Sequence, residues 1–456
     1  MRALALSLTL TLTTFAAAQA AQSYYVAKTG SDTNSGTEAS PFLTITHAIG
    51  LLDEPDDRIY VKAGTYNEHV QIWDKHGSLA TPIRVQGYGT DVPIIDGTGI
   101  DENGLVEIGD SSYVNFDQFE VQNAIAHGIF IYNADNIKVR YNKVHGSQEC
   151  GINAYTSSSS NFGTTHDISI LNNRVYDNVK MNSTGNASSW QQGLSAYRAN
   201  NVQIIDNSVY ENYGEGIDFI MSNNGLISHN RVRDNFSANI YLDNATLTTV
   251  ERNFIHSYEY TAYYRNGDPA GGIVMANEDY TVNNVTTHNP LDNIKIYNNI
   301  ILRAGNGIQY GNWDYGHGLH HTLIANNTIY GAKYYDLYLQ LEKDSTNAHD
   351  TTTIVNNAFV QSASTKNYAS APTSNITYSN NLWYGGNSSS TISGTNDRTG
   401  NPMFAELGGW DDTDYAIALG SDCIDHGASQ SSTFTSDYFS TSAVRTGTYD
   451  IGADEY

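Results

Sequence analysis

The chain is 456 residues long and carries 48 acidic against 23 basic side chains, a formal net charge of −25 at pH 7. Affinity for nucleic acid comes mainly from lysine and arginine, so this balance excludes nucleic acid as the expected partner. Beyond the first twenty residues, no apolar run reaches the length of a membrane-spanning helix, and no membrane span is expected.

Residues 1–20 have the parts of a secretory signal peptide. Arg2 precedes an apolar stretch from Leu4 to Phe15, and small side chains end the segment at Ala18 and Ala20. The sequence therefore predicts a secreted protein, either extracellular or periplasmic.

The segment Thr44–Leu52 has apolar side chains at helical spacing and comes shortly before Asp57–Val61, a predicted opening strand. A helix at this point would cover the open end of a sheet, where backbone groups lack partners. We therefore predict a helical cap at the N-terminal end of the structure.

From residue 142 onward, an asparagine recurs two residues before an apolar side chain at nine positions. The shortest interval is 23 residues, which is about one turn of a β-solenoid, and the longer intervals are that turn plus an insertion. We interpret these residues as a ladder in which each asparagine occupies a turn at positive φ and bonds to the equivalent amide one coil away. The ladder contains Asn142, Asn173, Asn207, Asn230, Asn253, Asn299, Asn327, Asn357 and Asn381.

Each repeat also contains a short strand that usually follows a glycine, and Ile129–Tyr132 is the first clear example. Successive side chains of a strand point to opposite faces, so Ile129 and Ile131 are predicted to lie in the core. The alternate positions form two outward columns, which we name after their acidic members. The Asp218 column contains Phe130, Asn153, Ser195, Asp218, Tyr241, Val274, Gln309 and Tyr338, and the Asp243 column contains Tyr132, Tyr155, Tyr197, Ile220, Asp243, Ala276, Gly311 and Gln340.

Insertions lengthen the repeats between about residues 150 and 320, and they are predicted to wall the two columns on both sides. The asparagine pattern stops after Asn381. We therefore predict a solenoid over residues 21–390 and a tail, residues 391–456, that folds back over the last coils. The protein is expected to be a monomer.

The glycine–strand–turn–asparagine coils resemble the right-handed parallel β-helix proteins of the pectate-lyase-like superfamily over residues 23–390. The opening segment Tyr24–Ala27 and the tail segment Cys423–Asp425 also look like flanks common in secreted bacterial β-helix proteins. The resemblance implies an all-β fold, a right-handed single-stranded parallel β-helix. As for function, the resemblance implies a superfamily that includes polysaccharide lyases, glycoside hydrolases, epimerases and esterases, as well as noncatalytic proteins.

Asp218 and Asp243 are the sharpest candidates for chemistry, because they fall on adjacent coils with an offset of two residues. Coils stack about 4.8 Å apart and two strand residues span about 6.7 Å, so a separation of about 8 Å is expected. That separation admits a water molecule beside a sugar, as in an inverting glycosidase. Together with Glu215, which precedes Asp218 in the turn, the same acids could instead bind Ca²⁺. Solvated strand residues are the plainer alternative.

A lyase that cleaves an acidic glycan must neutralise a uronate carboxylate and remove the proton on the adjacent carbon. The resemblance implies Ca²⁺ and an arginine or lysine base for many β-helix lyases. Arg198 is therefore a candidate to assist at the substrate carboxylate, and Arg265 a candidate to bind substrate. Since arginine keeps its proton at ordinary pH, Tyr197 is the easier base. Surface ion pairs are the alternative role for both arginines.

Five aromatic residues are candidates for sugar subsites, because aromatic faces pack on the C–H faces of sugar rings. They are Tyr132, Tyr155 and Tyr241 on the outward columns and Trp190 and Trp313 in the flanking insertions. Outward tyrosines also stabilise a sheet by stacking on one another, and the sequence leaves both roles open.

The two cysteines, Cys150 and Cys423, could pair, although Cys150 fits better as a small buried hydrophobe. Taken together, the sequence predicts a secreted enzyme that binds a polysaccharide, most simply a lyase that cleaves an acidic polysaccharide by β-elimination. An inverting glycoside hydrolase that uses two carboxylates and a noncatalytic glycan-binding protein are the alternatives.

Overall fold

The computed structural model describes residues 21–456 except 158, 185–188, 283, 288–289, 314–316, 342–347, 441, 443 and 446, and it leaves out the side chains of 282, 287 and 312. The predicted signal peptide lies outside the described residues, so secretion stays a prediction.

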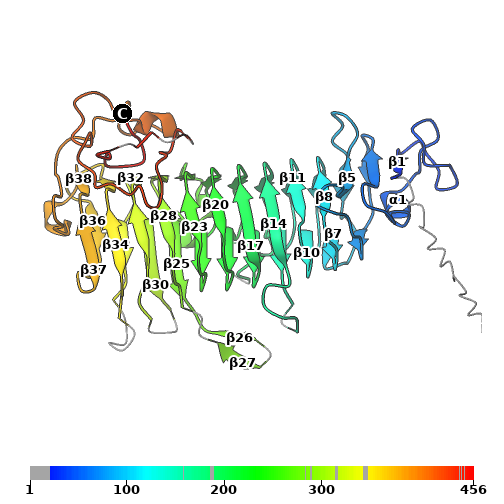
Figure 1. The fold of residues 1–456 in the computed structure, drawn as a ribbon, viewed down its shortest axis with the longest axis horizontal. Helices are drawn as coiled ribbons and strands as arrows, with labels where there is room; N and C mark the ends of the chain where they lie inside the picture. The colour runs from blue at the N-terminus through cyan, green and yellow to red at the C-terminus, as the bar shows by residue number, and fades with distance from the viewer. Residues whose placement is uncertain are drawn as a thin grey trace, which may run out of the picture.

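Three long parallel sheets run side by side along one axis, with the chain progressing from one end of the molecule to the other (Figure 1). Among the described residues the sheets have 13, 11 and 12 strands, and each coil contributes one strand to each sheet in turn. We call them sheets 1, 2 and 3. This arrangement is the predicted parallel β-helix.

Sheet 1 consists of β1 (Ser23–Val26), β2 (Arg58–Val61), β5 (Ile83–Gly87), β8 (Val114–Asp117), β11 (Lys138–Arg140), β14 (His166–Leu171), β17 (Asn200–Ile205), β20 (Leu226–Ser228), β23 (Thr249–Glu251), β28 (Lys295–Tyr297), β31 (Leu323–Ala325), β34 (Thr352–Val355) and β37 (Ile376–Ser379). Sheet 2 consists of β4 (Val70–Trp73), β7 (Gly104–Gly109), β10 (His127–Tyr132), β13 (Ile152–Tyr155), β16 (Gln192–Tyr197), β19 (Glu215–Ile220), β22 (Ala238–Asp243), β25 (Gly271–Asn277), β30 (Asn306–Asn312), β33 (Tyr335–Leu339) and β36 (Asn367–Ser370). Sheet 3 consists of β3 (Thr65–Tyr66), β6 (Ile94–Asp96), β9 (Glu120–Gln122), β12 (Lys143–His145), β15 (Arg174–Tyr176), β18 (Ser208–Tyr210), β21 (Arg231–Arg233), β24 (Phe254–His256), β29 (Ile300–Leu302), β32 (Thr328–Tyr330), β35 (Ala358–Val360) and β38 (Leu382–Tyr384).

An antiparallel hairpin, β26 (Tyr280–Val282) and β27 (Val285–Thr287), projects from the solenoid after β25 (Figure 1). Short 3-10 turns lie at Lys180–Asn182, Thr261–Tyr263, Arg265–Gly267, Ser388–Ser390 and Asp412–Tyr415.

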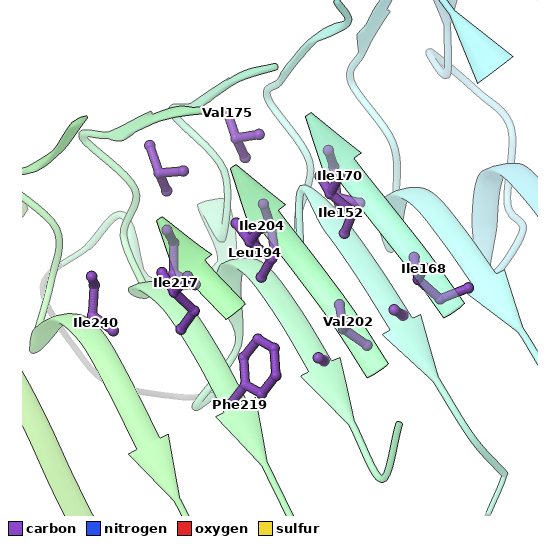
Figure 2. Close-up of a cluster of buried hydrophobic side chains, with 14 of the residues drawn as sticks. Ile152, Ile168, Ile170, Val175, Leu194, Val202, Ile204, Ile217, Phe219 and Ile240 are labelled. Carbon is purple, nitrogen blue, oxygen red and sulfur yellow. The ribbon is translucent and has the colours of Figure 1, made fainter. Parts of the chain in front are cut away.

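The core is a set of apolar stacks that point inward from the three sheets (Figure 2). Ile152, Leu194, Ile217 and Ile240 occupy equivalent positions on successive strands of sheet 2, and each is fully buried. Burial in a stack of this kind stabilises the fold by roughly 1.5–3 kcal/mol per aliphatic side chain. The predicted alternation of inward and outward side chains on sheet 2 is therefore confirmed, and it fixes which side chains point away from the core.

The predicted asparagine ladder is present between sheets 1 and 3. The backbone N–H and the Nδ2 group of Asn142 donate to Asn173 Oδ1 at 2.9 and 3.1 Å. The same two bonds repeat at each step to Asn381. There, Asp397 Oδ1 accepts from the Asn381 N–H at 2.9 Å and ends the ladder.

The positive φ angle, however, belongs to the residue before each ladder asparagine and not to the asparagine itself. Tyr141 has a φ of 58° and Asn380 has a φ of 53°, with similar values at the corresponding positions between them. The physical reason is that the preceding residue makes the turn, while the asparagine already begins the extended segment that leads into sheet 3. Its side chain can then point inward along the stack.

A second, shorter ladder, which the sequence interpretation missed, lies between sheets 3 and 2. Asn178 donates through its N–H and its Nδ2 group to Asn212 Oδ1, both at 3.1 Å. Asn212 makes the same pair of bonds to Asn235 Oδ1, at 3.2 and 2.9 Å. Each of these residues follows a ladder asparagine by five positions, a signal that the sequence contains. This ladder fixes the turns that lead into β16, β19 and β22.

The N-terminal helical cap is not supported. Only α1 (Ile45–Ile49) forms there, a helix of five residues that begins after the N-cap Thr44 and ends at Gly50. Ile45, Ala48 and Ile49 are buried in the main core. The apolar spacing thus placed a helical turn correctly, but the chain leaves the helix before it is long enough to cover the end of the solenoid.

The C-terminal residues lie at the far end of the solenoid (Figure 1), where they pack on outward side chains of sheet 3 and, through Phe434 and Tyr449, of sheet 1. Trp410 packs between Tyr258, with ring centroids 5.5 Å apart, and the guanidinium of Arg303, 3.7 Å from its ring. Phe404 and Tyr415 join an apolar cluster formed by outward side chains of β24, β29, β32, β35 and β38. The outward face of sheet 3 is apolar where the tail covers it.

Cys150 and Cys423 are both unpaired and buried. The Cys150 thiol donates to Gln191 Oε1 at 2.8 Å, which agrees with its interpretation as a small buried residue. Within the described part of the chain, no helix has the length and apolar character needed to cross a membrane.

Candidate functional site

A pocket with a volume of about 860 Å³ lies on the outward face of sheet 2, over β16, β19, β22, β25 and β30. Its floor is made by residues of the strands and its walls by residues of the insertions. It is lined by Trp190, Gln192, Glu215, Asp218, Ile220, Ser237, Ala238, Tyr241, Asp243, Arg265, Pro269, Gly271, Val274, Glu278, Tyr280, Gly305, Asn306, Gln309, Trp313 and Tyr334.

The register of sheet 2 brings the two predicted aspartates to this pocket. Asp218 on β19 pairs with Tyr241 on β22, and Ile220 pairs with Asp243. Asp218 and Asp243 therefore lie on neighbouring strands with an offset of two residues, as predicted. Both side chains are almost completely buried, with 1% and 2% of their surface exposed.

Glu215 and Asp218 form a carboxyl pair at the start of β19. Burial raises the pKa of Glu215 to about 7, and a hydrogen bond with Asp218 and a hydrogen bond from Gln192 oppose that rise. Burial raises the pKa of Asp218 well above its usual range, and the charges of Glu215 and Asp243 raise it further. Asp218 Oδ1 is buried without a hydrogen-bond partner. Both shifts favour the protonated form, so we expect the two carboxyls to share a proton as a pair.

Asp243 and Glu278 each accept a hydrogen bond from a tyrosine. The Tyr280 hydroxyl donates to Asp243 Oδ2, and the Tyr241 hydroxyl donates to Glu278 Oε1. Burial and the nearby carboxylates, Asp243 before the others, raise the pKa of both tyrosines. Each phenol therefore stays protonated and acts as a donor that stabilises the charged form of its carboxylate.

Asn244 holds the backbone of Glu278 through two hydrogen bonds. Its Oδ1 accepts from the Glu278 N–H at 2.7 Å, and its Nδ2 donates to the Glu278 carbonyl at 2.8 Å. Trp313 Nε1 donates to the Tyr241 hydroxyl at 3.2 Å. Residues from two separate insertions thus meet over β22 and fix the wall of the pocket on the side where the strands end.

The opposite wall carries a positive charge. The Arg265 guanidinium lies 4.4 Å from the ring of Trp190, in cation–π geometry. Among the described residues that line the pocket, Arg265 is the only lysine, arginine or histidine, whereas four carboxyl groups line it. The pocket is therefore acidic overall.

Of the predicted site residues, seven line the pocket: Glu215, Asp218, Asp243, Tyr241, Trp190, Arg265 and Trp313. Arg198 does not line it. Its guanidinium donates to the Ser157 carbonyl at 2.8 Å, and its own backbone forms a turn with a φ of 51°. The side chain therefore points away from the strand face and bonds to the insertion that follows β13. Burial raises the pKa of Tyr197, which makes it a poor base.

Tyr132, Tyr155 and Tyr197 lie outside the pocket and stack on one another. The ring centroids of Tyr132 and Tyr155 are 6.1 Å apart and those of Tyr155 and Tyr197 are 4.9 Å apart, with interplanar angles of 12° and 9°. Their faces therefore contact each other and do not form the platform for sugar faces that was predicted. In-register strands place equivalent rings one coil apart, which is the distance for stacking.

Sequence reasoning missed Tyr280 and Tyr334, and it assigned no role to Gln192. Tyr280 and Tyr334 come from segments outside the outward columns, and nothing in their spacing marks them. Gln192 could have been found, because it pairs with Glu215 in the register of sheet 2 and precedes Leu194 by two residues.

The predicted Ca²⁺ site at Glu215, Asp218 and Asp243 has no geometric support. Among the described residues, no three His, Cys, Asp or Glu side chains are arranged to hold a metal ion. The raised pKa values of Glu215 and Asp218 also make this pair a weak donor set for a hard cation, which prefers charged oxygens. Dependence on Ca²⁺ stays a prediction that has not been tested.

Residues 24–249 match the family described as Pel9A-like, right handed beta helix region. The chain thus contains a Pel9A-like right-handed β-helix, and the predicted resemblance to pectate-lyase-like proteins is confirmed. No curated protein matches the chain.

Several solved structures share the fold. Pectate lyase Pel9A has a TM-score of 0.57 and 17% identity, over 96% of this chain and 97% of its own. A complex of XylC with xylose has a TM-score of 0.58 and 12% identity, over 95% and 98%. A mutant of AlyGC, an alginate lyase of family PL6, has a TM-score of 0.50 and 14% identity, over 82% and 55%. At such identities the likeness concerns the fold alone.

Proposed function

We propose that the pocket on sheet 2 is the active site of a glycoside hydrolase that cleaves an uncharged glycan. The observation that carries the proposal is the Glu215–Asp218 pair, whose two carboxyls both have raised pKa values, beside Asp243, which accepts a hydrogen bond from Tyr280, all in one pocket. Glycoside hydrolysis needs one carboxylic acid that gives a proton and one carboxylate that receives one. Environment separates the two roles here, as it must when both groups are carboxyls.

Asp218 is the general acid of this proposal. It transfers its proton to the glycosidic oxygen as the C–O bond breaks, and Glu215 keeps the proton on the pair beforehand. Asp243 is the general base, which removes a proton from the water that attacks the anomeric carbon. The offset of two residues on adjacent strands corresponds to a backbone separation of about 8 Å, and a similar distance between the carboxyls would suit inversion.

The charge of the pocket favours a sugar that carries no carboxylate. Four carboxyl groups face one arginine, so a uronate would meet net repulsion. Trp190, Trp313 and Tyr334 offer aromatic surface to sugar rings from the walls. The structure of XylC with bound xylose is an instance of a protein with a similar fold that binds a neutral sugar.

A lyase that acts on an acidic polysaccharide is the second candidate, because Arg265 lines the pocket and could bind a uronate carboxylate. The folds of pectate lyase Pel9A and alginate lyase AlyGC are consistent with this candidate. It requires a base, however, and the tyrosines nearest the acids have raised pKa values while Arg198 bonds elsewhere. We therefore rank it below hydrolysis.

The deciding experiment incubates the protein with xylan, β-glucan, galactomannan, polygalacturonate and alginate. New reducing ends without ultraviolet absorbance of an unsaturated product are expected on a neutral polymer, and proton NMR of early product should show the inverted anomer. Asp218→Asn and Asp243→Asn should each lower the rate at least 100-fold, while Glu120→Gln on sheet 3, away from the pocket, should leave it unchanged. An unsaturated product from either acidic polymer would refute hydrolysis and establish the lyase.

A further inference from the structure

The Asp243 column does not stop at the pocket. Strand register continues it without a break from Asp243 through Ile220 to Tyr197, Tyr155 and Tyr132 on the preceding coils. Ile220 lines the pocket, so Tyr197 is the first residue beyond it. The charge of Asp243 also contributes to the raised pKa of Tyr197, after burial and the neighbouring Tyr155, which shows that the row and the pocket adjoin.

The stacking of these three tyrosines determines what they present to solvent. Because the ring faces contact each other, each half-buried side chain shows its edge and its hydroxyl. None of the three hydroxyls has a hydrogen-bond partner among the described residues. The result is a straight row of phenolic hydroxyls, with ring centroids 4.9 to 6.1 Å apart, which leads out of the pocket toward the N-terminal coils.

The two ends of the column differ. Toward the C-terminal coils it reaches Gly311, where the indole of Trp313 fills the space: a Cβ atom at Gly311 would lie 2.7 Å from Trp313 Cζ2. Trp313 also lines the pocket and donates to Tyr241, so this side of the column is closed. Toward the N-terminal coils the half-buried row continues as far as Trp73, whose ring stacks on Tyr132 with the centroids 5.9 Å apart.

We propose that the tyrosine row is an extended glycan subsite, so that the enzyme acts on chains that leave the pocket toward the N-terminal coils only. The proposal rests on the proposed function, and it adds the polymer length and the direction in which the chain is bound. Sugar hydroxyls would bond to the phenols of Tyr197, Tyr155 and Tyr132 in turn. The spacing of the rings is similar to the advance of one sugar residue along an extended chain.

The test uses tyrosine-to-phenylalanine variants, which keep the ring stack and remove only the hydroxyl. Retention on gels that contain xylan, β-glucan or galactomannan measures binding for Tyr155→Phe and for Tyr132→Phe with Tyr155→Phe. The matched control is Tyr176→Phe on sheet 3, whose ring stacks on Tyr210 at 5.1 Å and 4° on a face away from the pocket. Each lost hydroxyl should weaken retention about 3- to 10-fold, the value of one hydrogen bond.

Hydrolysis of short and long substrates separates this inference from the proposed function. With oligosaccharides of whichever neutral polymer the protein cleaves, the row variants should lose rate on the hexasaccharide and keep it on the disaccharide, which is too short to extend along the row. If Asp218→Asn binds a polymer but neither wild type nor any variant cleaves one, the proposed hydrolysis is wrong, while the tyrosine row remains supported as a glycan subsite. Equal retention of the row variants and wild type, or no retention of wild type on any polymer, would overturn the row as a subsite.

Discussion

Replacement of Glu215 by glutamine should change how the stability of the protein depends on pH. Glu215 is 6% exposed, and its pKa rises from 4.5 to about 7 on folding. Below pH 4.5 the carboxyl is protonated in both states and costs nothing. Between pH 4.5 and 7 the folded state keeps a proton that the unfolded state has lost, so stability falls as pH rises, and above pH 7 the full penalty is present.

A shift of about 2.5 units at 1.36 kcal/mol per unit gives a penalty of about 3 kcal/mol for Glu215 at pH 8. Glutamine has the shape of the protonated acid and cannot ionise. Glu215→Gln should therefore gain up to about 3 kcal/mol relative to wild type between pH 4 and pH 8. This gain in the free energy of unfolding is an upper bound. Because Glu215 and Asp218 are coupled, the substitution also changes the ionisation of Asp218, which offsets part of the gain.

Urea unfolding at half-unit steps from pH 4 to pH 9 measures this difference in the free energy of unfolding. Glu120→Gln is the control, because Glu120 is bound by Lys143 and His145, which lower its pKa, and its loss should destabilise the protein at neutral pH. If Glu215→Gln and wild type lose the same stability between pH 4 and pH 8, then folding does not raise the pKa of Glu215, and Glu215 does not help to keep a proton on the pair with Asp218, as the proposed mechanism requires.

Two further predictions concern the ladder and the metal. Asn230→Ala should destabilise the protein by about 3 kcal/mol in urea unfolding, because it leaves the buried Ile204 carbonyl and the Asn207 side-chain amide without their hydrogen bonds to Asn230. The control Asn161→Ala, at an exposed position, should change stability by less than about 0.5 kcal/mol. Similar values for both variants would contradict a structural role for the ladder. Treatment with EDTA should leave the rate on the neutral polymer unchanged, since the described acids form no three-residue metal group, and a loss of rate that Ca²⁺ restores would show that the pocket holds a cation.

Periodicity alone was enough to predict the outward columns and hence the pair Asp218 and Asp243. A stacked coil has one register, and an error of one residue would have moved every apolar side chain of a strand to the solvent face. The apolar spacing over Thr44–Leu52 does not fix the length of the helix, because it fits the single turn Ile45–Ile49 as well as a longer cap. Arg198 failed as a candidate for a similar reason, since its position after a strand did not specify the direction of the turn.

The sequence by itself determined the solenoid, the asparagine ladder and the two acids on the outward face, because these features repeat at the spacing of the backbone and need no distant partner. Only the tertiary structure decided which insertions reach the pocket. Tyr280 and Trp313 meet Asp243 and Tyr241 across gaps of 37 and 72 residues. Such contacts depend on loop paths that have no period. It also decided the raised pKa values of Glu215 and Asp218, because burial and the proximity of like charges arise only when the coils stack.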